Sequence, residues 1–242
     1  MMDDEKRNAE PQLGSTAAQL GPSVAAKLGL GVPVPVPVPR WYSRGYLPHY
    51  DDVSRLQFIT YRLADSLPQS VLHSMEAELV ELPDSEQASE RRRKIESYLD
   101  AGMGCCALRH PAVAAVVQET LLKFDGEKYQ LMEWCIMPNH VHVLIHPKIE
   151  LGRILQSWKS YTGRWALARN AELGLGVPGK AFWMREYWDR YIRDERHLLQ
   201  TIEYIHNNPV KAKLCQQAQD WPWGSAGAPS PSSATPQRKE NS

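Results

Sequence analysis

A run of alternating histidines and aliphatic residues, HVHVLIH, begins at His140 and ends at His146. In a β-strand, successive side chains point to opposite faces, so His140, His142 and His146 would share one face. The aliphatic residues between them would then face a hydrophobic core. Two imidazoles two residues apart can bind one metal ion, which is the chemistry that a His-x-His pair offers. The alternative, surface histidines on a half-exposed strand, is open at this point.

A second pair of polar side chains lies in the segment YIHNNPVK, which begins at Tyr204. Tyr204 and Asn208 are four residues apart, and on a helix such residues lie one above the other on the same face. The phenol oxygen and the amide oxygen could therefore address one point in space. Pro209 predicts that the helix stops before it, which would free the Asn208 side chain to turn away from the helix axis. The alternative is a core aromatic residue followed by a capping asparagine.

The hydrophobic patterns predict the elements that must hold these side chains. The predicted strands cover residues 56–63, 128–136, 140–145 and a short stretch within 182–192. The predicted helices cover residues 68–80, 85–99, 112–124, 151–168 and 194–207. This order favours an α+β fold, and within that class a ferredoxin-like antiparallel sheet with helices on one face.

The composition separates a folded domain from two tails. Residues 1–40 are rich in Gly, Ala, Ser and Pro and include a Val-Pro alternation, so we expect an extended, disordered segment. Residues 227–242 have no large apolar side chain, and we expect them to be disordered as well. The folded domain would then span residues 41–226.

The overall charge and the apolar runs exclude several classes of protein. With 28 basic and 28 acidic residues, the net charge of zero excludes a uniformly basic nucleic-acid coat. No apolar run reaches the roughly 18 residues that span a bilayer, so we expect no membrane partner. The acidic start MMDDEKRNAE is not a secretory signal, and four cysteines at no metal-ligand spacing suit a reducing cytoplasm.

Four segments together, in this order, resemble a known family. They read MPNHVHVLI, FWMREYWDRYIRDE, YIHNNPVKAKL and DWPWGSA, and they are similar to segments of the REP-associated tyrosine transposases. That family is related to the single-strand insertion-sequence transposases, which have one catalytic tyrosine and a His-hydrophobe-His (HUH) motif. The segment GYLPHYDDVSRLQFITYRLADSLP also resembles the first-strand region of one subgroup. The resemblance covers about residues 41–226.

The resemblance implies a role for each motif residue. His140 and His142 match the HUH pair, which binds Mg²⁺ or Mn²⁺, and Tyr204 matches the nucleophile. Asn208 falls where the insertion-sequence enzymes have a glutamine as third metal ligand, so direct ligation by the shorter side chain stays open. Tyr161 is a rival nucleophile, but its Trp and Ile neighbours at helical spacing predict that it packs against the core.

The implied activity is metal-dependent nicking and strand transfer of single-stranded DNA through a 5′-phosphotyrosine bond. The substrate would be a REP-type hairpin, and the protein would act as a monomer or a homodimer. The basic residues that could follow the phosphates are Lys148, Lys159, Arg164, Arg190, Arg193 and Lys211. Two alternatives are a hairpin-binding module without cleavage and a metal-dependent hydrolase that uses water as the nucleophile.

Overall fold

Four antiparallel strands form the central sheet of the computed structural model, which describes residues 40–43 and 48–227. The strands lie in the spatial order β4-β5-β3-β6. Their bounds are β3 (Gln57–Arg62), β4 (Tyr129–Ile136), β5 (His140–Pro147) and β6 (Trp188–Tyr191). This strand order, with every pair antiparallel, is that of a ferredoxin-like sheet, so the predicted fold class is confirmed.

The predicted tails, residues 1–40 and 227–242, lie almost entirely outside the described residues, and their predicted disorder stays a prediction. Within the described part of the chain, no helix is both long enough and apolar enough to cross a membrane.

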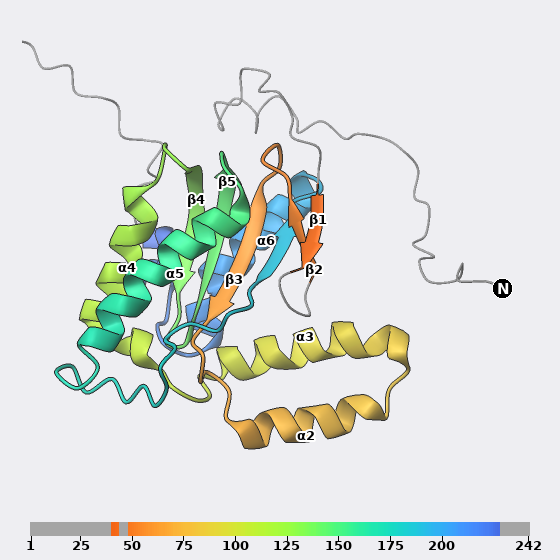
Figure 1. The fold of residues 1–242 in the computed structure, drawn as a ribbon. Coiled ribbons are helices and arrows are strands. Elements are labelled where there is room, and N and C mark those ends of the chain that lie inside the picture. Colours follow the sequence, from red (N-terminus) through yellow and green to blue (C-terminus); the bar gives the residue numbers. More distant parts are fainter. Residues whose placement is uncertain (1–39, 44–47, 228–242) are drawn as a thin grey trace, which may run out of the picture. The chain divides into compact units, whose positions relative to one another are not determined.

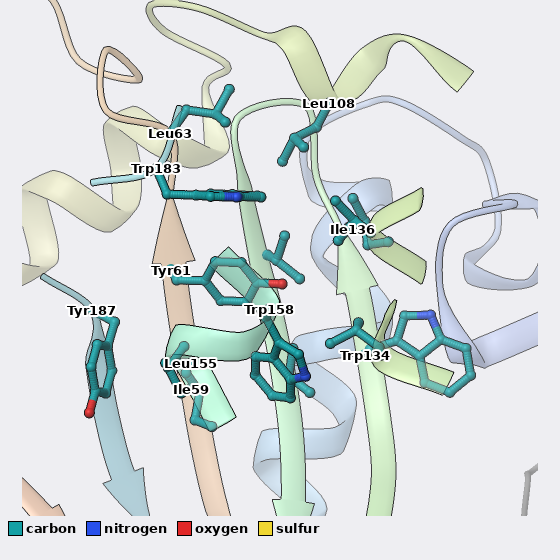
Figure 2. Close-up of a cluster of buried hydrophobic side chains, with 14 of the residues drawn as sticks. Ile59, Tyr61, Leu63, Leu108, Trp134, Ile136, Leu155, Trp158, Trp183 and Tyr187 are labelled. Atoms are coloured by element: carbon teal, nitrogen blue, oxygen red, sulfur yellow. The ribbon is translucent and has the colours of Figure 1, made fainter. Parts of the chain in front are cut away.

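Two helices, α4 (Pro111–Lys123) and α5 (Leu151–Ala168), cover one face of the sheet (Figure 1). Alternate residues of β3 point to this face, so that Ile59 and Tyr61 pack with Trp158 of α5 (Figure 2). Burial of such aliphatic and aromatic side chains contributes most of the stability of a domain of this size.

Another helix, α6 (Glu195–Lys211), lies on the opposite face of the sheet (Figure 1), so the prediction of helices on one face holds for α4 and α5 but not for α6. Asp194 caps its start by accepting a hydrogen bond of 2.8 Å from the backbone N–H of His197. The predicted stop before Pro209 is wrong, because α6 continues through Pro209 to Lys211. So close to a helix end, proline removes a single backbone hydrogen bond, and the carbonyls of Asn208 and Pro209 still accept hydrogen bonds from the residues that follow.

A helical hairpin joins β3 to the rest of the domain. Its helices are α2 (Gln69–Val80) and α3 (Asp84–Asp100), and Figure 1 shows them running side by side. Their facing sides form a small hydrophobic core of their own. Its buried members are Leu67, Met75, Leu79, Ile95 and Leu99.

Both edges of the sheet are covered by segments that the hydrophobic patterns did not predict as structured. On one side, β2 (Pro48–Asp51), which pairs with β1 (Arg40–Ser43), contacts β6, and the Tyr50 N–H donates to Asp189. On the other side, the Ile136 N–H donates to the carbonyl of Trp223 at 2.8 Å. Covered edges remove the unpaired strand that would otherwise invite aggregation. The short 3₁₀ helices are η1 (Ala107–Arg109), η2 (Ala218–Asp220) and η3 (Ser225–Gly227).

Candidate active site

His140 and His142 lie side by side on the sheet face that α6 covers. On β5 they pair across the sheet with Arg62 and Thr60 of β3, and both imidazoles are fully buried. The two Nε2 atoms are 2.9 Å apart. The strand geometry predicted from the sequence therefore holds for this pair. His146, on the same face, is only partly buried and lies four residues further along the strand.

Neighbouring side chains fix how these two rings are oriented. Nδ1 of His140 donates to the amide oxygen of Asn139 at 2.7 Å, which leaves a lone pair on Nε2 of His140. Nδ1 of His142 lies 2.9 Å from the hydroxyl of Thr60. Burial lowers the pKa of His140 to about 3 and the pKa of His142 well below its usual value. Both rings are therefore neutral at neutral pH, which is the form in which imidazole binds a metal.

α6 brings Tyr204 and Asn208 to the same place. Nδ2 of Asn208 lies 3.1 Å from Nε2 of His142, and the Tyr204 ring meets the His142 ring edge-on with centroids 5.2 Å apart. Half a turn of the Asn208 amide exchanges its nitrogen and oxygen, which would direct the oxygen toward the histidines. Among the described residues, Oδ1 of Asn208 and the Tyr204 hydroxyl are buried and have no hydrogen-bond partner.

One residue of the site, Asp100, was missed in the sequence. Its Oδ1 lies 3.5 Å from Nε2 of His140, and one ligand atom from each of Asp100, His140 and His142 lies within 4.8 Å of the others. Burial, and then the negative charge of Glu96, raises the pKa of Asp100 to about 6. Nothing in the sequence marks Asp100, because it ends a charged helix 40 residues before the histidines, and only tertiary packing brings them together.

The donor set fits a divalent metal ion. Imidazole nitrogens together with amide and carboxylate oxygens are common ligands of such ions. Three oxygens around the histidine pair, one each on Asp100, Tyr204 and Asn208, are buried without a hydrogen-bond partner among the described residues. Buried polar atoms are rarely left unpaired, so this cluster indicates that a partner from outside the chain completes it.

An arginine-lined cavity of about 220 Å³ opens beside Tyr204. Arg92 of α3 and Arg190 of β6 line it, and Arg92 also pairs with Glu96 at 3.0 Å. A second hollow of about 350 Å³ lies at the start of α6. Both are lined by His197 and Gln200, so the two hollows are neighbours along α6.

Three of the six basic residues predicted to contact DNA lie near this site. Arg190 lines the cavity beside Tyr204, and Arg193 lines the second hollow. Nζ of Lys211 lies 5.5 Å from the centroid of the Tyr204 ring.

The other three predicted basic residues lie away from the candidate site. Lys159 and Arg164 belong to α5, on the opposite face of the sheet, and Nζ of Lys159 donates to the carbonyls of Met184 and Arg185. Lys148 follows the far end of β5, where its Nζ donates to the Gly126 carbonyl. Their basic charge suggested contact with phosphates, but their positions, which the sequence does not reveal, place them away from the histidines.

The two tyrosines considered as nucleophiles differ in position. Tyr161 is 54% exposed on α5, so the prediction that it packs against the core is wrong. It is nonetheless far from the candidate site, because α5 covers the other face of the sheet. For Tyr204, burial and then the negative charges of Asp100 and Glu96 raise the pKa of the phenol well above its usual value.

Comparisons with known proteins agree with the resemblance. Residues 110–208 match the family model described as "Transposase IS200 like". The REP-associated tyrosine transposase of Escherichia coli strain K12 is 22% identical over 110 residues, which cover 45% of this chain and 61% of that protein. A protein of Haemophilus influenzae that bears the same family name is 24% identical over 111 residues, or 40% of this chain and 58% of that protein.

A solved structure described as "Structure of the REP associates tyrosine transposase bound to a REP hairpin" is also similar. It matches with a TM-score of 0.42 and 16% identity, over 77% of this chain and 82% of that one. The chain thus spans about three fifths of the length of the curated relatives named above. The similarity to this family, expected from the four motifs, is confirmed by the family model and the relatives.

Proposed function

We propose that this chain, which resembles the REP-associated tyrosine transposases, nicks and rejoins single-stranded DNA through a covalent bond to Tyr204. The observation that carries the proposal is the meeting of Tyr204 with the two histidines. Its ring contacts His142, and its hydroxyl is buried with no partner among the described residues. The matched family segment, residues 110–208, contains both histidines, Tyr204 and Asn208.

His140, His142 and Asn208 would hold a divalent ion, either Mg²⁺ or Mn²⁺. When bound, such an ion polarises the phosphorus centre and neutralises the charge that develops there. Asn139 and Thr60 support this role, because each contacts the Nδ1 atom of one histidine and so keeps its ring in one orientation.

Tyr204 is the nucleophile of the proposed reaction. Its phenolic oxygen loses its proton and bonds to phosphorus, and the bond from phosphorus to the 3′-oxygen breaks. The 3′-oxygen gains a proton and leaves as a free 3′-hydroxyl, while the 5′-phosphate stays on Tyr204. Burial raises the pKa of the Tyr204 phenol and the positive charge of Arg92 opposes that rise; a divalent ion at the histidines would favour the phenolate further. The phosphotyrosine keeps the energy of the original bond, so a 3′-hydroxyl of another strand can reverse the step and join DNA without ATP.

An unpaired DNA strand would suit the two neighbouring hollows, the first of which lies beside Tyr204. Arg92 and Arg190 would contact phosphates near the nicked position, and Arg193 would contact them further along. The resemblance, and the name that the relatives carry, favour a REP-type hairpin as the substrate.

The test uses the full chain, Mn²⁺ or Mg²⁺, and a panel of labelled hairpins with single-stranded flanks. A denaturing gel should show a covalent protein–DNA species for one or more hairpins and none for the same sequences fully paired. Cleavage of the duplex as fast as the single strand would contradict the proposed substrate. Cleavage without any covalent species would favour the hydrolase, and binding without cleavage would favour the binding module.

A further inference from the structure

The carboxylate of Asp100 lies against the histidine pair but comes from a different part of the chain. α3 and the hairpin that it forms with α2 precede residues 110–208, the segment that matches the transposase family. Asp100 is in the last turn of α3, and its Oδ1 lies 3.5 Å from Nε2 of His140. The hairpin therefore adds an acidic group to a site whose two histidines, tyrosine and asparagine lie within the matched segment.

Local contacts hold Asp100 in this position. The side chain of Asn139 accepts from Nδ1 of His140 at 2.7 Å and donates to the carbonyl of Met103 at 2.9 Å. One amide thus connects the loop after α3 to the histidine. At Gly104 a Cβ atom would lie 2.4 Å from the Asp65 carbonyl oxygen, so only glycine allows this close approach. The contacts of Met103 and Gly104 hold the loop that follows α3, and so they restrict the position of Asp100.

The surroundings of Asp100 are unfavourable for a lone anion. The C-terminal end of a helix carries a partial negative charge, which repels a carboxylate. Glu96, one turn earlier on α3, adds a second negative charge that acts on Asp100. The Asn208 amide and the positive charge of Lys211 favour the anion in part, but Oδ1 of Asp100 is buried and has no hydrogen-bond donor among the described residues. A cation shared with the histidines would relieve all three costs.

We propose that Asp100 is a further ligand of the divalent cation held by His140, His142 and Asn208. This inference rests on the proposed function and refines its metal site. Without Asp100 the ligands are two neutral imidazoles and a neutral amide, whereas with Asp100 they include one anionic oxygen. A carboxylate favours hard cations such as Mg²⁺ and Mn²⁺, and its charge would let the chain bind the cation before any DNA phosphate arrives.

The test measures binding of Mn²⁺ to the full chain in the absence of DNA, from the electron paramagnetic resonance signal of the free ion. Asp100→Asn keeps the size of the side chain and removes the anionic oxygen, so the dissociation constant should rise at least about tenfold. Glu96→Gln is the matched control, because it removes one negative charge from the same helix end without removing a ligand. Its effect should stay within about threefold, since a charge that acts through space is partly screened.

The outcomes separate this inference from the proposed function. Equal weakening by the two variants, or unchanged Mn²⁺ affinity in Asp100→Asn, would overturn the role of Asp100 and leave the histidine site standing. No Mn²⁺ binding by the wild type would overturn the metal site itself. Asp100→Glu keeps a carboxylate and should recover part of the affinity, which rules out a folding defect as the cause. Thermal unfolding of each variant without metal checks that the fold is intact.

Discussion

The two faces of the central sheet differ in how their unpaired buried polar atoms are arranged. In the core under α4 and α5 the indole nitrogen of Trp134 has no partner among the described residues, whereas three unpaired oxygens gather around the histidine pair on the other face. On the face covered by α4 and α5, the Trp158 indole donates to the Tyr129 hydroxyl at 2.9 Å, and that hydroxyl donates to the Leu121 carbonyl at 2.6 Å. On the face covered by α6, the buried oxygens of Tyr204 and Asn208 have no such partner among the described residues.

One face of the sheet therefore serves mainly the stability of the fold, and the other carries the candidate site. A buried polar atom that is fully hydrogen-bonded stabilises the fold and has no further bond to offer. An unpaired one costs stability, and several of them gathered at one point, as around the histidine pair, indicate a partner from outside the chain. The same strand, β5, supplies both faces, with Val141 and Val143 in the core and His140 and His142 in the site.

The largest expected effect is on the α6 face. His142→Ala, or His140→Ala, should abolish the covalent protein–DNA species, because the cation then loses one of its nitrogen ligands. Chelation by EDTA should have the same effect, and Mn²⁺ should restore activity to the wild type only. Each substitution leaves a cavity at a fully buried position, so urea unfolding is used to compare the adduct per folded molecule. Full activity in EDTA would contradict the role assigned to the metal.

A substitution on the α5 face should produce the opposite result. Trp158→Ala empties a fully buried position and should lower the free energy of unfolding by about 3–5 kcal/mol. The rate of adduct formation per folded molecule should change little, because Trp158 is on the other side of the sheet from Tyr204. Urea unfolding and the gel assay, run on the same preparation, give both quantities. A loss of activity greater than the loss of folded protein would show that the two faces are coupled.

A smaller effect should appear in the dependence of stability on pH. Burial lowers the pKa of Lys159 on α5 to about 7. In an unfolded chain the pKa of a lysine is about 10.4. Between pH 7 and pH 10 the unfolded state therefore holds more protons, and stability rises with pH by up to about 1.4 kcal/mol per unit. Lys159→Met should lack this rise when urea unfolding is measured at pH 7, 8 and 9. Parallel profiles for the wild type and the variant would contradict it.

The sequence predicted the parts of the site that depend on one element at a time. Alternation along a strand placed His140 and His142 on one face, and a spacing of four residues placed Tyr204 with Asn208. Both depend only on the local geometry of a strand or a helix. The helix 151–168 was predicted with the bounds that the structure gives to α5, because its apolar stripe is long and regular.

The predictions that failed concern how elements pack against one another. Asp100 reaches His140 only through the α2–α3 hairpin, and no local pattern encodes that contact. Tyr161 has apolar neighbours in sequence, yet it points to solvent, since Trp158 and not Tyr161 faces the sheet. Pro209 was read as the end of a helix, but its cost is small in the last turn, where one missing backbone donor matters little.

The most direct test of the account identifies the residue that becomes attached to DNA. After incubation of the wild type with a cleaved hairpin and Mn²⁺, peptide mass spectrometry should find the 5′-phosphate on Tyr204. Tyr204→Phe keeps the ring in its contact with His142 and should remain folded, yet form no adduct, while Tyr161→Phe should form the adduct as the wild type does. An adduct that survives in Tyr204→Phe and disappears in Tyr161→Phe would contradict the assignment of Tyr204 as the nucleophile.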